Sequence, residues 1–86
     1  MASRPRPIRT RRAAAQLGAQ LAATREQQRL SVDQLAERAS ITRGTLRRVE
    51  NGDPAVGLAA FLTVVKALGQ LDALMAALAP PEDDEG

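Results

Sequence analysis

Two helix start signals lie close together in the middle of the chain, and they limit how it can fold. Ser31 is followed three residues later by Gln34, the pattern of a capping box at a helix N-terminus. Thr42 is a second N-cap residue. Apolar residues recur at helical spacing after each signal. We therefore expect two short helices, over 31–39 and 42–50, joined by a turn of two or three residues.

The rest of the chain is also predicted to be helical. It holds 17 Ala and 11 Leu but only one aromatic residue, and Ala and Leu are strong helix formers. A helix capped by Thr10 is expected to run to about Gln28 and to present Ala14, Leu17, Leu21 and Thr24 on one face. The sequence predicts a single all-α domain of five helices over 10–79.

Glycines mark the limits of the later helices. Gly52 suits the left-handed residue that follows a helix, and Gly57 and Gly69 bracket a fourth helix. A fifth is expected from about Asp72 to Ala79, before a Pro-Pro pair. The buried stripe of the fourth helix is predicted to be Leu58, Phe61, Leu62, Val65 and Leu68.

Composition excludes several classes of function. The chain has no Cys and no His, so disulfides, the usual zinc sites and the commonest general base are absent. It shows no nucleophile–base set and no phosphate-binding loop, so we expect no enzyme activity, no metal and no cofactor. No apolar run approaches the length of a membrane span, and no signal peptide is recognisable. The protein is expected in the cytoplasm.

The ends of the chain carry opposite charge. The first twelve residues hold five arginines and no acid, whereas 82–85 are all acidic. We expect a disordered basic arm over 1–9 and a disordered acidic tail over 80–86. The opposite charges suggest that the arm and the tail bind different partners. Two solvated ends that only keep a small domain soluble are the alternative. The arginines are Arg4, Arg6, Arg9, Arg11 and Arg12.

The two short central helices have the spacing of a helix-turn-helix motif. Their tight turn requires a steep crossing, and the small residues Ala36 and Ala39 fall where the helices touch. A generic helical hairpin in a small bundle would fit the same spacing. The second helix favours the first interpretation, because Leu46 and Val49 face inward while three arginines share the opposite face. Such a face fits the major groove, where Arg binds guanine O6 and N7.

Residues 17–69 resemble the Cro/phage-repressor (XRE) helix-turn-helix family. The resemblance is carried by Leu17-Gly18 with Leu21 and Arg25, by Leu30-Ser31 with Leu35-Ala36 and Ala39, by Ile41-Thr42 with Thr45-Leu46 and Val49-Glu50-Asn51-Gly52, and by Leu58, Leu62, Val65 and Ala67-Leu68-Gly69. It implies a compact five-helix, phage-repressor-like fold and sequence-specific binding of double-stranded DNA.

Within that family, the run from Glu50 to Leu58 and the following Phe61-Leu62 look most like HipB-type antitoxins of toxin–antitoxin operons. This implies a homodimeric repressor that binds a palindromic operator, regulates its own operon and holds a HipA-like kinase toxin. A free-standing phage or plasmid repressor is the alternative. The sequence departs from the family at Val32, where Gln often holds a phosphate, and at Arg29 and Ser40, where Gly is usual.

The expected site residues follow from the motif and the resemblance. Glu50 points partly inward, and a buried carboxylate needs a partner, for which Arg25 is the natural choice; two surface charges are the alternative.

A protein-interaction module whose main activity is to bind a kinase is a second possible function. We predict base-edge contacts from Thr42, Arg43, Gly44, Arg47 and Arg48, phosphate contacts from Ser31, Thr45, Asn51 and the arm arginines, and a dimer interface at Leu71, Leu74, Met75 and Leu78.

Overall fold

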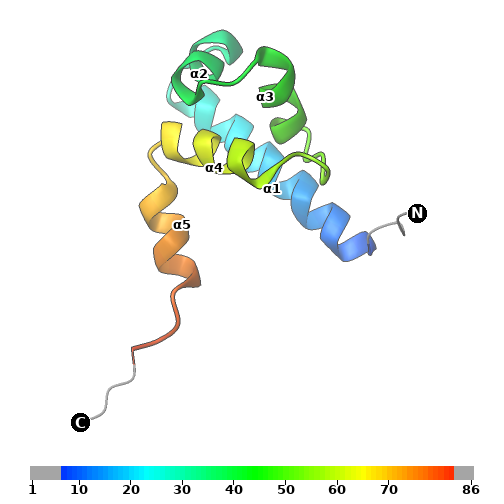
Figure 1. Cartoon of the computed structure of the whole chain (residues 1–86), viewed down its shortest axis with the longest axis vertical. Coiled ribbons are helices and arrows are strands. Elements are labelled where there is room, and N and C mark those ends of the chain that lie inside the picture. The colour runs from blue at the N-terminus through cyan, green and yellow to red at the C-terminus, as the bar shows by residue number, and fades with distance from the viewer. Residues whose placement is uncertain (1–6, 83–86) are drawn as a thin grey trace.

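The computed structural model describes residues 7–82, and within them the chain forms five α-helices and no strand. The fold class is therefore the all-α class that the sequence predicts. Helices α2 and α3 lie at one end of the molecule, α4 packs against both of them, and α5 extends from the opposite end (Figure 1). The helices are α1 Ile8–Gln27, α2 Val32–Ala39, α3 Arg43–Glu50, α4 Leu58–Ala67 and α5 Leu71–Leu78.

The first helix begins earlier than predicted. Its N-cap is Pro7, with φ −54° and ψ 148°, and the Pro7 carbonyl accepts a hydrogen bond from the Arg11 N–H at 3.1 Å. Proline is tolerated at this position because the N–H that it lacks would make no hydrogen bond within the helix. Thr10 therefore lies inside the helix, and the prediction that it caps α1 is wrong. Residues 8 and 9, which were assigned to the basic arm, are helical.

Local hydrogen bonds define both ends of α2. The Ser31 hydroxyl accepts from the Gln34 N–H at 3.0 Å, and the Gln34 side chain accepts from the Ser31 N–H at 2.8 Å, which confirms the capping box. Ser40 ends α2 in the left-handed conformation, with φ 58°. The Ile41 N–H then returns to the Ala36 carbonyl at 3.0 Å. The chain thus reverses within a few residues and α3 can begin.

The core lies where these helices meet. Leu35 of α2, Leu46 of α3 and Val64 of α4 are all 0% exposed. Ala36 and Ala39 are also buried, as their predicted place in the steep crossing requires. The core therefore locks α2 and α3 onto α4 as one unit. The remaining buried apolar residues are Leu21, Leu30, Val49, Val65 and Leu68.

Two glycines let α1 touch the end of α3 backbone to backbone. A Cβ on Gly18 would lie 2.5 Å from the Glu50 carbonyl oxygen and 2.6 Å from that of Val49. A Cβ on Gly52, whose φ is +71°, would overlap the Cα of Ala15. No real side chain tolerates such approaches. These glycines therefore set how closely α1 supports the C-terminal end of α3.

Leu58 belongs to the predicted buried stripe of α4, but it does not face the core. Leu58 is 70% exposed and Leu17 is 46% exposed. Leu58 is the first residue of α4, where the chain enters from a loop and no described element covers it. Val64, outside the predicted stripe of α4, takes the central place instead. Phe61 and Leu62 are half-buried.

Helix α5 contributes little to the core. None of its residues is buried, and its main contact with the rest of the fold is with α4 (Figure 1). Across residues 7–82, no single helix is long and apolar enough to cross a membrane. Helices α4 and α5 meet those criteria only together, as a pair bent by 118°.

Candidate nucleic-acid interface

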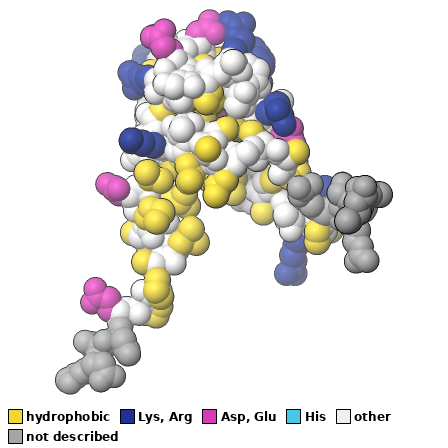
Figure 2. All heavy atoms as spheres, in the orientation of Figure 1, with side chains coloured by type: hydrophobic (Ala, Val, Ile, Leu, Met, Phe, Trp, Pro, Cys, Tyr) yellow, Lys and Arg dark blue, Asp and Glu magenta, His cyan; other side chains and the backbone are white. Residues whose placement is uncertain are grey.

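The outer face of α3 carries the predicted base-contacting residues. Arg43, Gly44, Arg47 and Arg48 are exposed, and Thr45 is half-buried. Leu46 and Val49 on the opposite side are buried, so the division into inner and outer faces agrees with the sequence. Charged side chains gather around this end of the molecule (Figure 2).

Arg43 forms an ion pair with Asp33 at this face. Its Nε and Nη2 atoms donate to Oδ1 and Oδ2 of Asp33 at 2.8 and 2.6 Å. Asp33 lies in the first turn of α2 and Arg43 is the first residue of α3, so the pair bridges the two starts of the motif. The hydrogen bond from Arg43 lowers the pKa of Asp33, and the carboxylate in turn raises the pKa of Arg43. Both charges are therefore present throughout the neutral range.

Arg48 and Arg47 differ from Arg43 in their ion-pair partners. The Arg48 Nε donates to Oδ2 of Asp53 at 3.0 Å, and Oδ1 of Asp53 accepts from the Ala55 N–H at 2.9 Å. Asp53 thus links α3 to the loop that follows it. Arg47 forms no ion pair with any residue in the described range 7–82. Its guanidinium is the most available of the three for a ligand.

The hydroxyl of Thr42 caps the N-terminus of α3. It accepts from the Thr45 N–H at 3.0 Å and lies 3.0 Å from the Thr45 hydroxyl. This confirms the predicted N-cap and ties the two threonines together at the start of α3. Gly44 next to them has open space, since the nearest atom to an added Cβ is the Thr42 Oγ1 at 3.9 Å. Its backbone is accessible from outside.

Two predicted phosphate contacts flank α3 on the surface. Ser31 is exposed at the N-terminus of α2, where backbone N–H groups and the helix dipole favour an anion. Asn51 is exposed at the C-terminal end of α3, and its N–H bonds the Arg47 carbonyl at 2.8 Å. Each residue is thus placed by a helix end.

The basic N-terminal arginines divide into two groups. Arg9, Arg11 and Arg12 are exposed on the first turns of α1, so these positive charges are held on a rigid helix rather than on a loose arm. Arg4 and Arg6 lie outside the described residues.

Arg25 and Glu50 form the predicted ion pair. The Arg25 Nε and Nη2 donate to the two Glu50 oxygens at 2.8 and 3.2 Å, and Nη1 donates to the Leu30 carbonyl at 2.9 Å. The side chains are only 13% and 10% exposed. The hydrogen bond to Glu50 raises the pKa of Arg25. The alternative of two separate surface charges is therefore wrong.

The sequence did not indicate the partners of Arg43 and Arg48. Neither Asp33 nor Asp53 is among the site residues that the sequence predicts. Asp33 and Arg43 sit on different helices, so only the helix crossing brings them together. Asp53 follows Arg48 by five residues across the end of α3, and this separation could have suggested a local pair.

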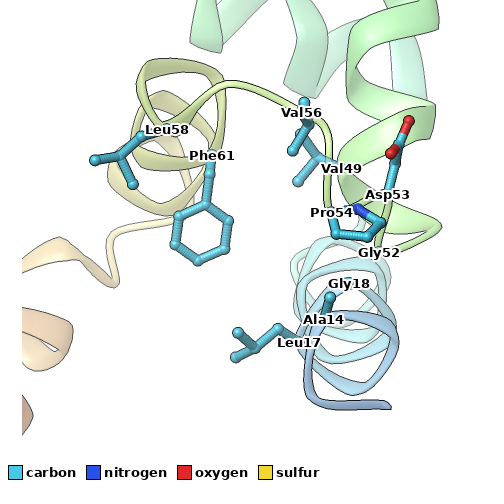
Figure 3. Close-up of a pocket in the computed structure, with 10 residues that line it drawn as sticks. All are labelled: Ala14, Leu17, Gly18, Val49, Gly52, Asp53, Pro54, Val56, Leu58 and Phe61. Carbon is cyan, nitrogen blue, oxygen red and sulfur yellow. The ribbon is translucent and has the colours of Figure 1, made fainter. Parts of the chain in front are cut away.

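An apolar pocket lies between α1, the loop after α3, and α4. It has a volume of about 280 Å³. Figure 3 shows Leu17 on one side and Leu58 and Phe61 on the other, with Pro54 and Val56 of the loop above them. Pro54 and Val56 belong to the run that resembles HipB-type antitoxins, and their side chains form one wall of this pocket.

The residues predicted for a dimer interface form the apolar side of α5. Met75 is 59% and Leu78 is 73% exposed, while Leu71 and Leu74 are half-buried against the core. Figure 2 shows hydrophobic atoms along α5 and across the adjoining surface of α4.

Two short helices joined by a tight turn, with a basic outer face on the second helix, define a DNA-binding helix-turn-helix domain. Residues 16–78 match the model of a family described as a helix-turn-helix domain. The match covers most of the chain, which therefore belongs to this helix-turn-helix family. No curated protein and no solved structure matches the chain.

Proposed function

We propose that the protein is a transcriptional repressor that binds specific sequences in double-stranded DNA as a cytoplasmic homodimer. The observation that carries this proposal is the exposed three-arginine face of α3. The Arg25–Glu50 pair holds this helix against α1. A helix of this kind enters the major groove, where Arg pairs with guanine O6 and N7. Thr42 and Gly44 lie at the same helix start and would face base edges.

Further contacts, to phosphate, are proposed from helix ends and from the N-terminal arginines. Ser31, Thr45 and Asn51 are placed at helix ends and would fix the register of the domain on the duplex. Arg9, Arg11 and Arg12 add positive charge on the first turns of α1, and Arg4 and Arg6 precede them in the chain. Neutralised phosphates release counterions, so binding should weaken steeply with salt.

The proposal is tested with a library of random duplexes from which the protein selects its preferred sites. We expect enrichment of a palindrome whose half-sites lie about 34 Å apart, one turn of duplex. Arg47→Ala should weaken binding to the selected duplex about tenfold or more if it contacts a base. Arg38→Ala is the matched control, because Arg38 is an exposed arginine on α2 that lines a different surface with Thr63 and Lys66.

Two results would overturn the DNA-binding proposal. One is a library that yields no enriched sequence. The other is equal loss of affinity in Arg38→Ala and Arg47→Ala, because the face of α3 would then act only as part of a general positive surface. A reporter gene placed behind the selected site then tests repression separately.

The finer proposal is that the protein is a HipB-like antitoxin that binds a HipA-like kinase toxin. It is supported by the resemblance of the loop from Glu50 to Leu58 and by the apolar pocket beside that loop (Figure 3). The 70% exposure of Leu58 would be relieved by a partner protein. The free-standing repressor is the alternative.

Co-expression with a kinase-like protein encoded beside this gene separates the two proposals. An antitoxin should co-elute with that protein, and Leu58→Glu should abolish the complex while leaving DNA binding unchanged. If the neighbouring genes encode no kinase-like protein, or if the two proteins elute separately, the free-standing repressor is the better description.

A further inference from the structure

The pair of Asp33 and Arg43 is the feature of the α3 face that DNA binding alone does not explain. An acidic side chain beside a helix that binds DNA repels phosphates. Yet Asp33 holds both the Nε and the Nη2 of Arg43, at 2.8 and 2.6 Å. The side chains are 65% and 57% exposed, so the pair is not part of the core.

The geometry of the guanidinium lets Arg43 keep this partner and still bind a base. Arg has five N–H groups in a planar fork. Asp33 occupies the edge formed by Nε and Nη2. The two N–H groups at the tip, one on each terminal nitrogen, remain and point away from the side chain in parallel. Two parallel donors match O6 and N7 of guanine.

The carboxylate also changes what Arg43 does with phosphate. An unpaired arginine on a long side chain reaches phosphates as readily as bases, and phosphate contacts carry no sequence information. Asp33 restricts the rotation of Arg43 and offsets its charge. Phosphate contacts therefore become less favourable, while the forked contact to a base edge is retained.

The other arginines of α3 lack this arrangement. Arg47 has no ion-pair partner in the part of the chain that the structure describes, and Asp53, which binds Arg48, belongs to the loop behind α3. Arg43 alone of the three is hydrogen-bonded to the other helix of the motif, whereas Arg47 acts on Asp33 only through its charge. Its position is therefore determined by the crossing of α2 and α3.

We infer that Asp33 is a specificity-determining residue, which positions Arg43 to bind one guanine in each half-site and limits its binding to phosphate. This inference rests on the proposed function, because it assigns a role within sequence-specific DNA binding. It makes Asp33 a positioning residue that acts through Arg43 and does not itself touch the base.

The test repeats selection from the random duplex library with variants of the full chain. The variants are Arg43→Ala, Asp33→Ala and the nearly isosteric Asp33→Asn. Glu37→Ala is the control, because Glu37 is an exposed acid on the same helix and forms no ion pair within residues 7–82. Circular dichroism checks that each variant remains helical.

We expect the wild type and Glu37→Ala to select a guanine at a position where Arg43→Ala selects no base. Both Asp33 variants should lose about tenfold in preference at that same position. Their affinity for a mixed-sequence duplex without the selected site should stay equal or rise, which a damaged fold would not produce.

Retention of the guanine preference in both Asp33 variants, when Arg43→Ala has lost it, would overturn the inference and leave the proposed function intact. An unchanged motif in Arg43→Ala would overturn it as well. Failure of the wild type to select any sequence would remove the proposed function and this inference together.

Discussion

Arg25 of α1 and Glu50 of α3 join two helices through a forked ion pair, with Nε and Nη2 of Arg25 at 2.8 and 3.2 Å from the two carboxylate oxygens. The third nitrogen of Arg25 donates to the Leu30 carbonyl, so one guanidinium links α1, the connector before α2 and the end of α3. Because α3 carries the candidate DNA-contacting face, this pair fixes the face relative to the rest of the domain.

Removal of one partner from this pair should destabilise the fold strongly. Arg25→Met or Glu50→Leu leaves an unpaired charge that is nearly buried, and we expect a loss of about 3 kcal/mol in the free energy of unfolding. The double variant Arg25→Met/Glu50→Leu should recover part of that loss, because no isolated charge remains. Urea unfolding measures all three. Single variants within about 0.5 kcal/mol of the wild type would show that the pair is a surface pair in solution.

The backbone contact between α1 and α3 predicts a severe effect of a single methyl group. Gly18→Ala should destabilise the domain by about 2 kcal/mol or more, because the added Cβ meets the carbonyl oxygens of Glu50 and Val49. Gly44→Ala is the matched control. Its site is open, so the change should be neutral or stabilising by up to about 1 kcal/mol. Thermal unfolding of the two variants compares them, and equal melting temperatures would refute the close contact.

The left-handed residue of the turn offers a stabilising substitution. Ser40 has φ 58°, a conformation that disfavours residues with a Cβ. Ser40→Gly should therefore raise the free energy of unfolding by up to about 1 kcal/mol, less the entropy that glycine adds to the unfolded chain. Ser40→Ala keeps the Cβ and should give no such gain. Chemical denaturation distinguishes these results, and a loss of stability in Ser40→Gly would contradict the turn geometry.

The Asp33–Arg43 pair predicts a particular pH dependence. Arg43 lowers the pKa of Asp33, so the folded protein binds this proton less readily than the unfolded chain. The stabilisation is therefore present above the usual pKa of an aspartate and is lost as the pH falls through the lowered value. An NMR titration of the Asp33 carboxyl group should show a midpoint below the usual range, and Arg43→Ala should move that midpoint back up toward the usual range. An unchanged midpoint in Arg43→Ala would show that the pair does not persist in solution.

The exposed side of α5 predicts the behaviour of the oligomer. If it forms the dimer interface, sedimentation should give roughly twice 9.1 kDa at micromolar concentration. Leu78→Glu should shift the protein toward monomer and weaken binding to the palindrome. The fold should remain, because Leu78 is 73% exposed. Glu82→Gln, an exposed change beyond the helix, is the control. A monomer that binds a half-site tightly and specifically would contradict the dimer.

The sequence by itself determined the helices and most of their ends. Ser31, Thr42 and Gly52 act through hydrogen bonds or backbone angles within a few residues, so their roles are visible without the fold. The start of α1 is the exception. Thr10 is the predicted N-cap, but the helix begins directly after Pro7. The inner and outer faces of α3 followed from helical periodicity alone.

Only the tertiary structure decided which residues meet across helices. The pairing of Asp33 with Arg43 and the approach of Gly18 to the Glu50 carbonyl depend on crossing angles, and packing in the core sets those angles. The exposure of Leu17, Leu58 and the outer side of α5 depends on where neighbouring helices end. Periodicity shows that a face is apolar, but it contains no information about whether another element covers it.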